Sequence, residues 1–251
     1  MLFRSELGRV YHPTLAINAA PAQFAAALAS VPLDGTRWAA GTQLSRAAYL
    51  EWSAAAPMPG PVHIGEIVRW LGDTLPDDAI ITTGAGNFSA WVQRHFCFKR
   101  YATHLAPING SMGYGFPAAL AAKLAAPDRT VVSVCGDGDY LMTGQELATA
   151  VAQKAAFVTL VINNGMYGTI RAHQEREFPA RVYATALHNP DFAAYARAFG
   201  AHGETVERTA GFAAAYARAV ASGKPALIEL RIDPEAISPS ATITSLRNRS
   251  R

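Results

Sequence analysis

The chain has 251 residues with a formal charge of +3; half of the residues are hydrophobic and 16% are charged. This much apolar side chain is enough for a packed core, so the composition excludes a disordered chain. The weak positive charge comes without an aromatic-rich basic groove, so we expect no nucleic-acid binding and interpret the arginines at 247, 249 and 251 as a solvated tail.

The N-terminal residues are predicted to form two helices, at 22–30 and 37–52. Pro21 precedes the first of them and is a favourable first helical residue. These 52 residues contain little core of their own, so we interpret them as the C-terminal remnant of a central domain whose beginning lies outside this sequence. Residues 53–61 hold three prolines and one glycine, which cannot continue a helix or a central strand. They are predicted to be a linker.

After the linker, short apolar strands alternate with helices. Strands are predicted at 79–83, 130–135, 157–163 and 226–231. Helices are predicted at 62–71, 117–126, 144–154, 191–199 and 211–222. This alternation is typical of the α/β class, with a doubly wound parallel sheet covered by helices on both faces. We expect this domain to span residues 62–237, and residues 238–251 to form the tail.

The cysteines and the hydropathy pattern limit the environment of the protein. Cys97 and Cys135 lack the CxxC spacing of a zinc site, and Cys135 lies in an apolar strand where it is predicted to be a small buried side chain. No stretch reaches the roughly 18 apolar residues of a membrane span, and the first residues lack the apolar region of a signal peptide. We therefore expect a cytoplasmic protein without membrane contact.

Two of the predicted strands end in turns that combine glycine with polar side chains. One strand runs into Gly136, Asp137, Gly138 and Asp139, and the other runs into Asn163, Asn164 and Gly165. Ligands bind beyond the carboxyl ends of strands in an open parallel sheet, and one crossover helix separates these two strands. Asp137 and Asn164 are therefore expected to be neighbours, where their oxygens suit Mg²⁺ and the following helix N-terminus favours a phosphate. Each turn alone is a common structural feature, so the prediction of a Mg²⁺-diphosphate site depends on their combination.

The segment from Gly136-Asp137-Gly138 to Asn163-Asn164 resembles the thiamine-diphosphate motif of the acetolactate synthase and 2-oxo acid decarboxylase superfamily. Residues 145–151 resemble the helix that lies between the two ends of that motif. The resemblance implies that Mg²⁺ is bound by Asp137, Asn164 and the backbone carbonyl of Met166. It also implies that the diphosphate is lined by Gly136, Gly138, Asp139, Tyr167 and Gly168.

Two upstream segments extend the resemblance. Residues 109–119 resemble the segment that holds this cofactor in a bent shape, which implies that Met112 is a wedge beneath its two rings and that the carbonyl of Gly110 accepts from its aminopyrimidine. The alternative for Met112 is an ordinary core methionine. The loop with Gly86, Asn87 and Phe88 is similar to a further diphosphate-contacting loop, in which Asn87 makes the polar contact.

In this superfamily, the glutamate that activates the cofactor comes from a separate pyrimidine-binding domain, usually in a neighbouring subunit. We do not expect that role from any of four glutamates considered in this chain, Glu146, Glu175, Glu177 and Glu229. The resemblance therefore implies the cofactor-binding half of a homo-oligomeric enzyme that acts on a 2-oxo acid, inactive alone. The chain would be a fragment of a longer enzyme or a separate subunit, and binding of FAD in the parent's central domain is left open.

The reaction itself is left open between three alternatives. Acetolactate synthases that resemble this chain have a tryptophan at the position of His173, so ligation of 2-oxo acids and their simple decarboxylation are both considered, beside a non-catalytic cofactor-binding module. Arg171 or His173 would face a substrate carboxylate, or both would belong to a polar helix surface around residues 173–177.

Overall fold

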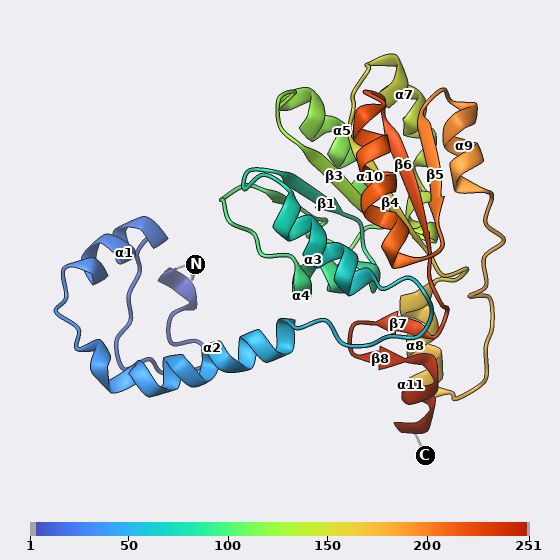
Figure 1. Ribbon diagram of the computed structural model, residues 1–251. Coiled ribbons are helices and arrows are strands. Elements are labelled where there is room, and N and C mark those ends of the chain that lie inside the picture. The colour runs from blue at the N-terminus through green and yellow to red at the C-terminus, as the bar shows by residue number, and fades with distance from the viewer. Residues whose placement is uncertain (1–3, 250–251) are drawn as a thin grey trace. The chain divides into compact units, whose positions relative to one another are not determined.

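The computed structural model describes residues 4–249, and the chain divides into two compact units, Met1–Glu51 and Trp52–Arg251 (Figure 1). The first unit is helical, and its elements are η1 (Arg4–Glu6), α1 (Pro21–Ala29), η2 (Gly35–Trp38) and α2 (Ala39–Ser53), which continues past the unit boundary. Both helices predicted in this region are confirmed, with Pro21 in the first turn of α1. None of residues 5–51 is buried, so this unit has no core of its own.

The second unit is built on a six-stranded parallel sheet with the order β2-β1-β3-β4-β6-β5 (Figure 1). Its strands are β1 (Ile80–Thr83), β2 (His104–Leu105), β3 (Val131–Gly136), β4 (Val158–Asn163), β5 (His202–Val206) and β6 (Ala226–Arg231). Alternate residues of the central strands enter two different cores; Val132 and Val134 of β3 face one, while Val131 and Cys135 face the other. Burial on both faces explains why these strands are continuously apolar.

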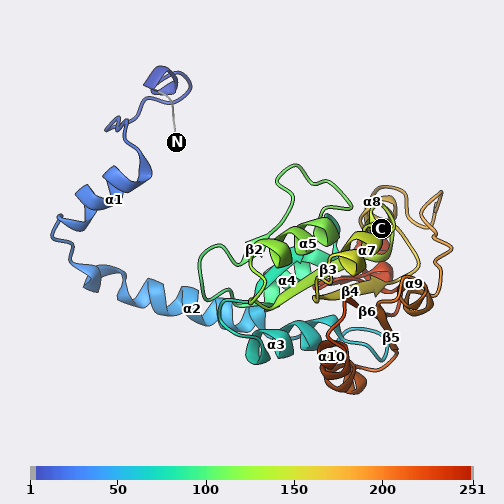
Figure 2. The same cartoon turned by 90° about the horizontal axis from the view of Figure 1, so that it is seen from above.

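Helices cover both faces of this sheet, which confirms the predicted α/β class (Figure 2). The first core lies under α3 (Ile64–Thr74), α4 (Phe88–His95) and α10 (Phe212–Ala221). The second lies under α5 (Gly115–Ala125), α7 (Leu147–Ala152) and α9 (Phe192–Ala198). The remaining helical elements of this part of the chain are α6 (Asp137–Tyr140), α8 (Gly168–Glu177) and the short 3₁₀ turns η3 (Gly144–Glu146) and η4 (Thr209–Gly211). Among residues 4–249, no helix has the length and apolar character needed to span a bilayer.

Residues 236–249 are folded, which corrects the prediction that residues 238–251 form a tail. Strands β7 (Ala236–Ser238) and β8 (Ala241–Thr242) form a hairpin, and α11 (Ile243–Arg249) follows it. A small core joins this segment to α8, because Ile243 and Leu246 are buried against Ala172 and Ile237. Arg247 contacts a buried carboxylate, while the side chain of Arg249 and the whole of Arg251 lie outside the described residues.

The elements that were not predicted from the sequence include strands β2, β5, β7 and β8 and helices α4 and α11. The strand β5 lies at the sheet edge, and only Gly203 and Val206 of its residues are buried. An edge strand with so little apolar surface lacks the hydrophobic pattern that marks the central strands. The strand β2 has two residues, too few for any periodic pattern.

Candidate cofactor-binding site

A cavity of about 260 Å³ lies beyond the carboxyl ends of the central strands. Its walls come from the loop after β1, the turns after β3 and β4, the start of α8 and the hairpin of β7. All of the candidate site residues predicted from the sequence line this one cavity: Gly86, Asn87, Phe88, Gly110, Met112, Gly136, Asp137, Gly138, Asp139, Asn164, Met166, Tyr167 and Gly168. Parallel-sheet domains bind ligands at this edge. The contacts of these residues with a cofactor stay predictions.

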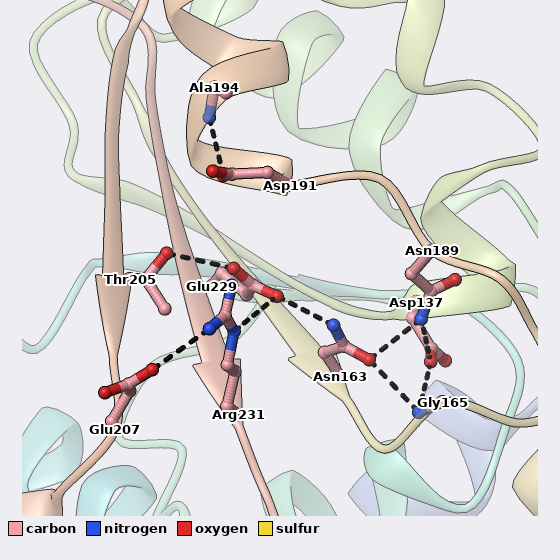
Figure 3. Close-up of polar contacts among 10 residues, drawn as sticks. All are labelled: Asp137, Asn163, Gly165, Asn189, Asp191, Ala194, Thr205, Glu207, Glu229 and Arg231. Atoms are coloured by element: carbon pink, nitrogen blue, oxygen red, sulfur yellow. Dashed lines mark hydrogen bonds and ion pairs between the residues drawn. The ribbon is translucent and has the colours of Figure 1, made fainter.

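Asp137 is held at the end of β3 by three hydrogen bonds. Its Oδ1 accepts from the amide of Gly138 at 2.9 Å. Its Oδ2 accepts from the amide of Gly165 at 2.9 Å and from Asn189 Nδ2 at 2.7 Å (Figure 3). Burial raises the pKa of the Asp137 carboxyl, and these hydrogen bonds oppose the rise. Because each carboxylate oxygen has two lone pairs, Oδ2 is fully used and Oδ1 keeps one for a cation.

The turn after β4 meets the turn after β3 directly. Gly165, whose φ of +70° favours glycine, brings its amide to Asp137, and Asn164 Oδ1 accepts from the amide of Met166 at 3.2 Å. One carboxylate and one amide oxygen therefore line the same cavity, and both are ligand types that Mg²⁺ accepts. Within residues 4–249 no three His, Cys, Asp or Glu side chains form a metal site. A cation here would need phosphate or water oxygens to complete its coordination.

Aromatic rings pack tightly against the glycines of the cavity. A Cβ on Gly138 would lie 2.6 Å from Tyr167 Cε1, and a Cβ on Gly136 would lie 2.7 Å from Phe88 Cδ1. Gly86 has the same relationship to Phe88, at 2.6 Å from its Cε1. Real Cβ atoms do not approach this closely, so any larger residue would displace the rings that form the cavity wall.

Asp139 connects the cavity floor to the segment that carries Met112. Its Oδ1 accepts from the amide of Gly113 at 2.8 Å, and its carboxyl group packs directly against Gly84. Burial raises the pKa of Asp139 to about 6, and the hydrogen bond from Gly113 opposes that rise. Asp139 therefore has a structural role in addition to its predicted place beside the diphosphate.

The side chain of Asn87 is engaged by the protein. Its Nδ2 donates to the carbonyl of Ile237 at 3.1 Å, and its Oδ1 accepts from Thr169 Oγ1 at 3.0 Å. Asn87 thus joins the loop after β1 to the start of α8 and to β7. Thr169 and Ile237 were missed by sequence reasoning, as was Asn189, because nothing in their local sequence marks contacts made across 82, 150 or 52 residues.

The rest of the cavity is largely apolar. Phe88 and Met112 share it with side chains that the sequence did not single out, namely Trp91, Ile162, Ile170, Ile232 and Ile237. Met112 is 36% exposed, which rules out the alternative of an ordinary core methionine. Gly110 has a φ of +72° at the edge of the same segment.

Apart from Thr169, the polar side chains of α8 are not among the residues that line the cavity. Arg171 pairs with Glu175 at 2.8 Å, and neither Arg171 nor His173 lines the cavity. Glu175 was predicted on a polar helix surface, and that interpretation is wrong because α11 covers it; its side chain is 1% exposed. Hydrogen bonds from Arg247, then from the Ala180 amide and Arg171, lower the pKa of Glu175 to about 2 against the effect of burial.

No glutamate is among the cavity-lining residues of the described chain. Glu146 accepts from Thr149 Oγ1 at 2.9 Å on its own helical segment. Glu229 is buried on β6, behind the cavity, where it accepts from Asn163 Nδ2. The cavity walls therefore combine two carboxylates, amide oxygens and glycine-rich turns at a switch of a doubly wound sheet, as in domains that bind a phosphate-bearing cofactor.

Comparison with known proteins identifies the family. The family model described as "Thiamine pyrophosphate enzyme, C-terminal TPP binding domain" matches residues 84–230. The chain therefore belongs to the thiamine pyrophosphate enzymes and carries their C-terminal cofactor-binding domain.

Several relatives are longer proteins than this chain. The acetolactate synthase isozyme 2 large subunit of Escherichia coli (strain K12) is 34% identical over 169 residues, which is 66% of this chain and 31% of that protein. The sulfoacetaldehyde acetyltransferase of Castellaniella defragrans is 32% identical over 148 residues, or 59% of this chain and 25% of that one. The chain thus spans about a third or less of the length of these relatives.

A solved structure shares the fold. The thiamine diphosphate-dependent 4-hydroxybenzoylformate decarboxylase of Rhodococcus jostii RHA1 aligns with a TM-score of 0.67 and 27% sequence identity. The alignment covers 72% of this chain and 34% of that one. The likeness agrees with the parallel sheet covered by helices on both faces.

Proposed function

We propose that this chain binds thiamine diphosphate through Mg²⁺, with Asp137, Asn164 and the carbonyl of Met166 as the protein ligands of the ion. The observation that carries the proposal is the contact between the two turns, in which Gly165 donates to Asp137 Oδ2 and leaves Oδ1 with a free lone pair beside the cavity. A single carboxylate with amide oxygens needs a further anion to hold a divalent ion, and the diphosphate supplies it.

The remaining cavity residues would bind and orient the cofactor. The glycine-rich turns at 136–138 and 165–168 would line the diphosphate, Met112 would support the two rings, and the carbonyl of Gly110 would accept from the aminopyrimidine. When bound, the cofactor supplies the carbanion chemistry. The apolar side chains of the cavity, such as Trp91 and Ile237, would exclude water from it.

We further propose that the chain is one half of an active site that decarboxylates or ligates 2-oxo acids, as in acetolactate synthase. The names of its relatives support this reaction class: acetolactate synthase for several of them and 4-hydroxybenzoylformate decarboxylase for the similar structure. The activating glutamate would come from a pyrimidine-binding domain, in another segment of the protein or in a second subunit of a homo-oligomer.

Calorimetric titration tests the binding proposal. Thiamine diphosphate is titrated into the chain with Mg²⁺ and again with EDTA in place of the ion. Wild type should bind only with the ion, and Asp137→Ala should lose binding by 100-fold or more, on the order of the loss of a charged ligand. Asp137→Asn keeps the size of the side chain and should bind nearly as poorly.

Asp77 provides the matched control, since its carboxylate pairs with Lys99 at the surface. Asp77→Ala should bind as wild type does. Circular dichroism of each variant reports whether the fold is kept. Binding by wild type that is indifferent to EDTA, or unchanged in a folded Asp137→Ala variant, would overturn the assignment of the ion.

A further inference from the structure

A row of polar side chains runs behind the cavity, from the β5–β6 edge of the sheet to Asp137 (Figure 3). Its central member is Glu229 of β6, whose side chain is 1% exposed and does not line the cavity. A carboxylate buried this deeply needs hydrogen-bond partners, and it has them on its own strand β6 and on the neighbouring strands β4 and β5. These partners connect Glu229 to the residues that hold Asp137.

Glu229 uses its two oxygens differently. Its Oε1 accepts from Asn163 Nδ2 at 2.7 Å, at the end of β4, and from Arg231 Nε at 3.3 Å. Its Oε2 accepts from Thr205 Oγ1 at 2.9 Å, on β5. Arg231 also pairs with Glu207 at 3.0 Å, so the single positive charge of Arg231 is shared between the two carboxylates.

The carboxylate of Glu229 determines which way the Asn163 amide faces. With Nδ2 directed at Glu229, Asn163 Oδ1 accepts from Asn189 Nδ2 at 2.8 Å and from the amide of Gly165 at 3.1 Å. The opposite orientation would place the amide oxygen against a carboxylate and the NH₂ group against two N–H donors. Only the first orientation gives Glu229 Oε1 a donor and the N–H groups of Asn189 and Gly165 an acceptor, and Glu229 supplies the charge that selects it.

Asn163 in turn directs Asn189 to Asp137. One hydrogen of Asn189 Nδ2 goes to Asn163 Oδ1 and the other to Asp137 Oδ2, at 2.7 Å. That bond and the one from the Gly165 amide use both lone pairs of Oδ2. The row therefore fixes the rotation of the Asp137 carboxylate and leaves Oδ1, with one free lone pair, as the oxygen available to a cation.

We propose that Glu229 is a positioning residue for the metal-binding carboxylate of Asp137, acting through Asn163 and Asn189. The inference rests on the proposed function, because it assigns the support of the same Mg²⁺ site. Side chains that orient a metal ligand in this way typically change metal affinity by roughly 10- to 100-fold when they are replaced.

Three variants separate this role from simple packing. Glu229→Met keeps the length of the side chain and removes the acceptor for Asn163. Glu229→Gln retains an oxygen for Asn163, since the Thr205 hydroxyl can rotate to accept from the new amide, so it serves as the conservative rescue. Thr205→Val removes the bond to Oε2 and leaves the bond to Asn163, so it is the matched control.

The first measurement needs no cofactor. In ¹⁵N-labelled chain, the side-chain NH₂ of Asn189 should give resolved signals protected from solvent exchange, because both hydrogens are bonded. We expect Glu229→Met to lose that protection, and Glu229→Gln and Thr205→Val to keep it. Retained protection in Glu229→Met would overturn the proposal.

The second measurement is the Mg²⁺ concentration for half-maximal binding of thiamine diphosphate, followed by fluorescence of Trp91, which lines the cavity. Glu229→Met should need roughly 10- to 100-fold more Mg²⁺ than wild type, while the two other variants stay within about threefold. At saturating Mg²⁺ the cofactor affinity of all four proteins should agree. General damage to the fold would lower that affinity too, and this result would count against the proposal.

Asn189→Ala tests the same connection if Glu229→Met does not fold. Asn189 is half-buried in the segment between α8 and α9, and its loss should raise the Mg²⁺ requirement by the same factor. An unchanged requirement in Asn189→Ala would contradict the role of the row. If wild type shows no Mg²⁺-dependent binding at all, the proposed function fails and this inference fails with it; if wild type binds and the variants match it, the inference alone fails.

Discussion

Arg247 of α11 and Glu175 of α8 are joined by two hydrogen bonds of 2.9 Å, across 72 residues of sequence. Arg171 adds a third contact to the same carboxylate at 2.8 Å. The helix that follows the β7–β8 hairpin is therefore attached by charge, and not by its small apolar core alone, to the helix that begins at the cavity. This attachment keeps Ile237 in the cavity wall.

The Glu175 network gives the fold a dependence on acid pH. The hydrogen bonds from Arg247 and Arg171 hold the pKa of Glu175 at about 2, below its ordinary 4.5. Because the pKa is lower in the folded state, this stabilisation is complete above pH 4.5 and is lost as the pH falls towards 2. It amounts to about 2 kcal/mol after allowance for solvent around Arg247.

Urea denaturation of wild type and Arg247→Met between pH 7 and pH 3 measures this contribution. Arg247→Met should be less stable at pH 7, and the difference should shrink as the pH falls. Arg208→Met, a change at the N-cap of η4, should show a difference that does not vary with pH. A difference for Arg247→Met that is constant over this range would show that the network does not set the pKa of Glu175.

Gly138 offers a second test, because the Tyr167 ring leaves no space for a side chain on it. Gly138→Ala should displace the ring and narrow the space beside Asp137, so we expect thiamine diphosphate to bind at least about tenfold more weakly while the fold is kept. The control is Gly211→Ala, where a Cβ would meet nothing within 4 Å. Calorimetry of both variants gives the result, and equal affinities would mean that Gly138 does not form part of the binding surface.

The central part of the fold could be predicted from the sequence because its signals are local. Strands β3 and β4 are largely apolar runs. The polar turns directly after them predicted the candidate site residues around Asp137 and Asn164. The parallel order of the sheet then placed both turns at one edge, without any need to know side-chain contacts.

The parts that were missed depend on contacts between distant segments. Nothing in the sequence around Asn189 marks it as a site residue, yet its Nδ2 donates to Asp137 Oδ2 across 52 residues. In the sequence, Glu175 is one of several charged residues on a polar helix. Only the structure shows that α11 covers it and that Arg247 donates to its carboxylate. The edge strand β5 has few buried side chains, so it lacks a hydrophobic pattern of its own. Its structure depends on its pairing with β6.

Exposed apolar side chains near the cavity predict self-association. Met112 and Ile170 line the cavity and are 36% and 51% exposed, and Leu141 and Met142 lie on the turn that packs against Gly113. Apolar surface of this kind usually marks an interface. Light scattering should show oligomers for wild type and a smaller species for a variant with Leu141→Lys and Met142→Lys.

The control for this test is Val220→Lys, since Val220 is 54% exposed on α10, away from the cavity-lining residues. Its oligomeric state should match wild type. A wild-type chain that is a stable monomer, or an effect of Val220→Lys equal to that of the double variant, would contradict an interface at the cavity.

Binding and turnover should separate in this chain. The cavity provides the candidate Mg²⁺ ligands, the glycine-lined turns and Met112, but among its described lining residues the only acids are Asp137 and Asp139. Asp137 is the proposed metal ligand, and Asp139 is 2% exposed with its Oδ1 bonded to the amide of Gly113, so we expect neither to act on the aminopyrimidine. General acid–base assistance typically raises the reaction rate by roughly 10²–10⁴-fold, and its loss should reduce turnover below detection. We expect the purified chain with Mg²⁺ and thiamine diphosphate to release no CO₂ from pyruvate or other 2-oxo acids. When a pyrimidine-binding domain is added, we expect the mixture to release CO₂. The assay is CO₂ release from several 2-oxo acids, with Asp137→Ala as the control that should stay inactive in the mixture. Robust release by the chain alone would mean that one of its own groups activates the cofactor, and the proposal of half an active site would then be wrong.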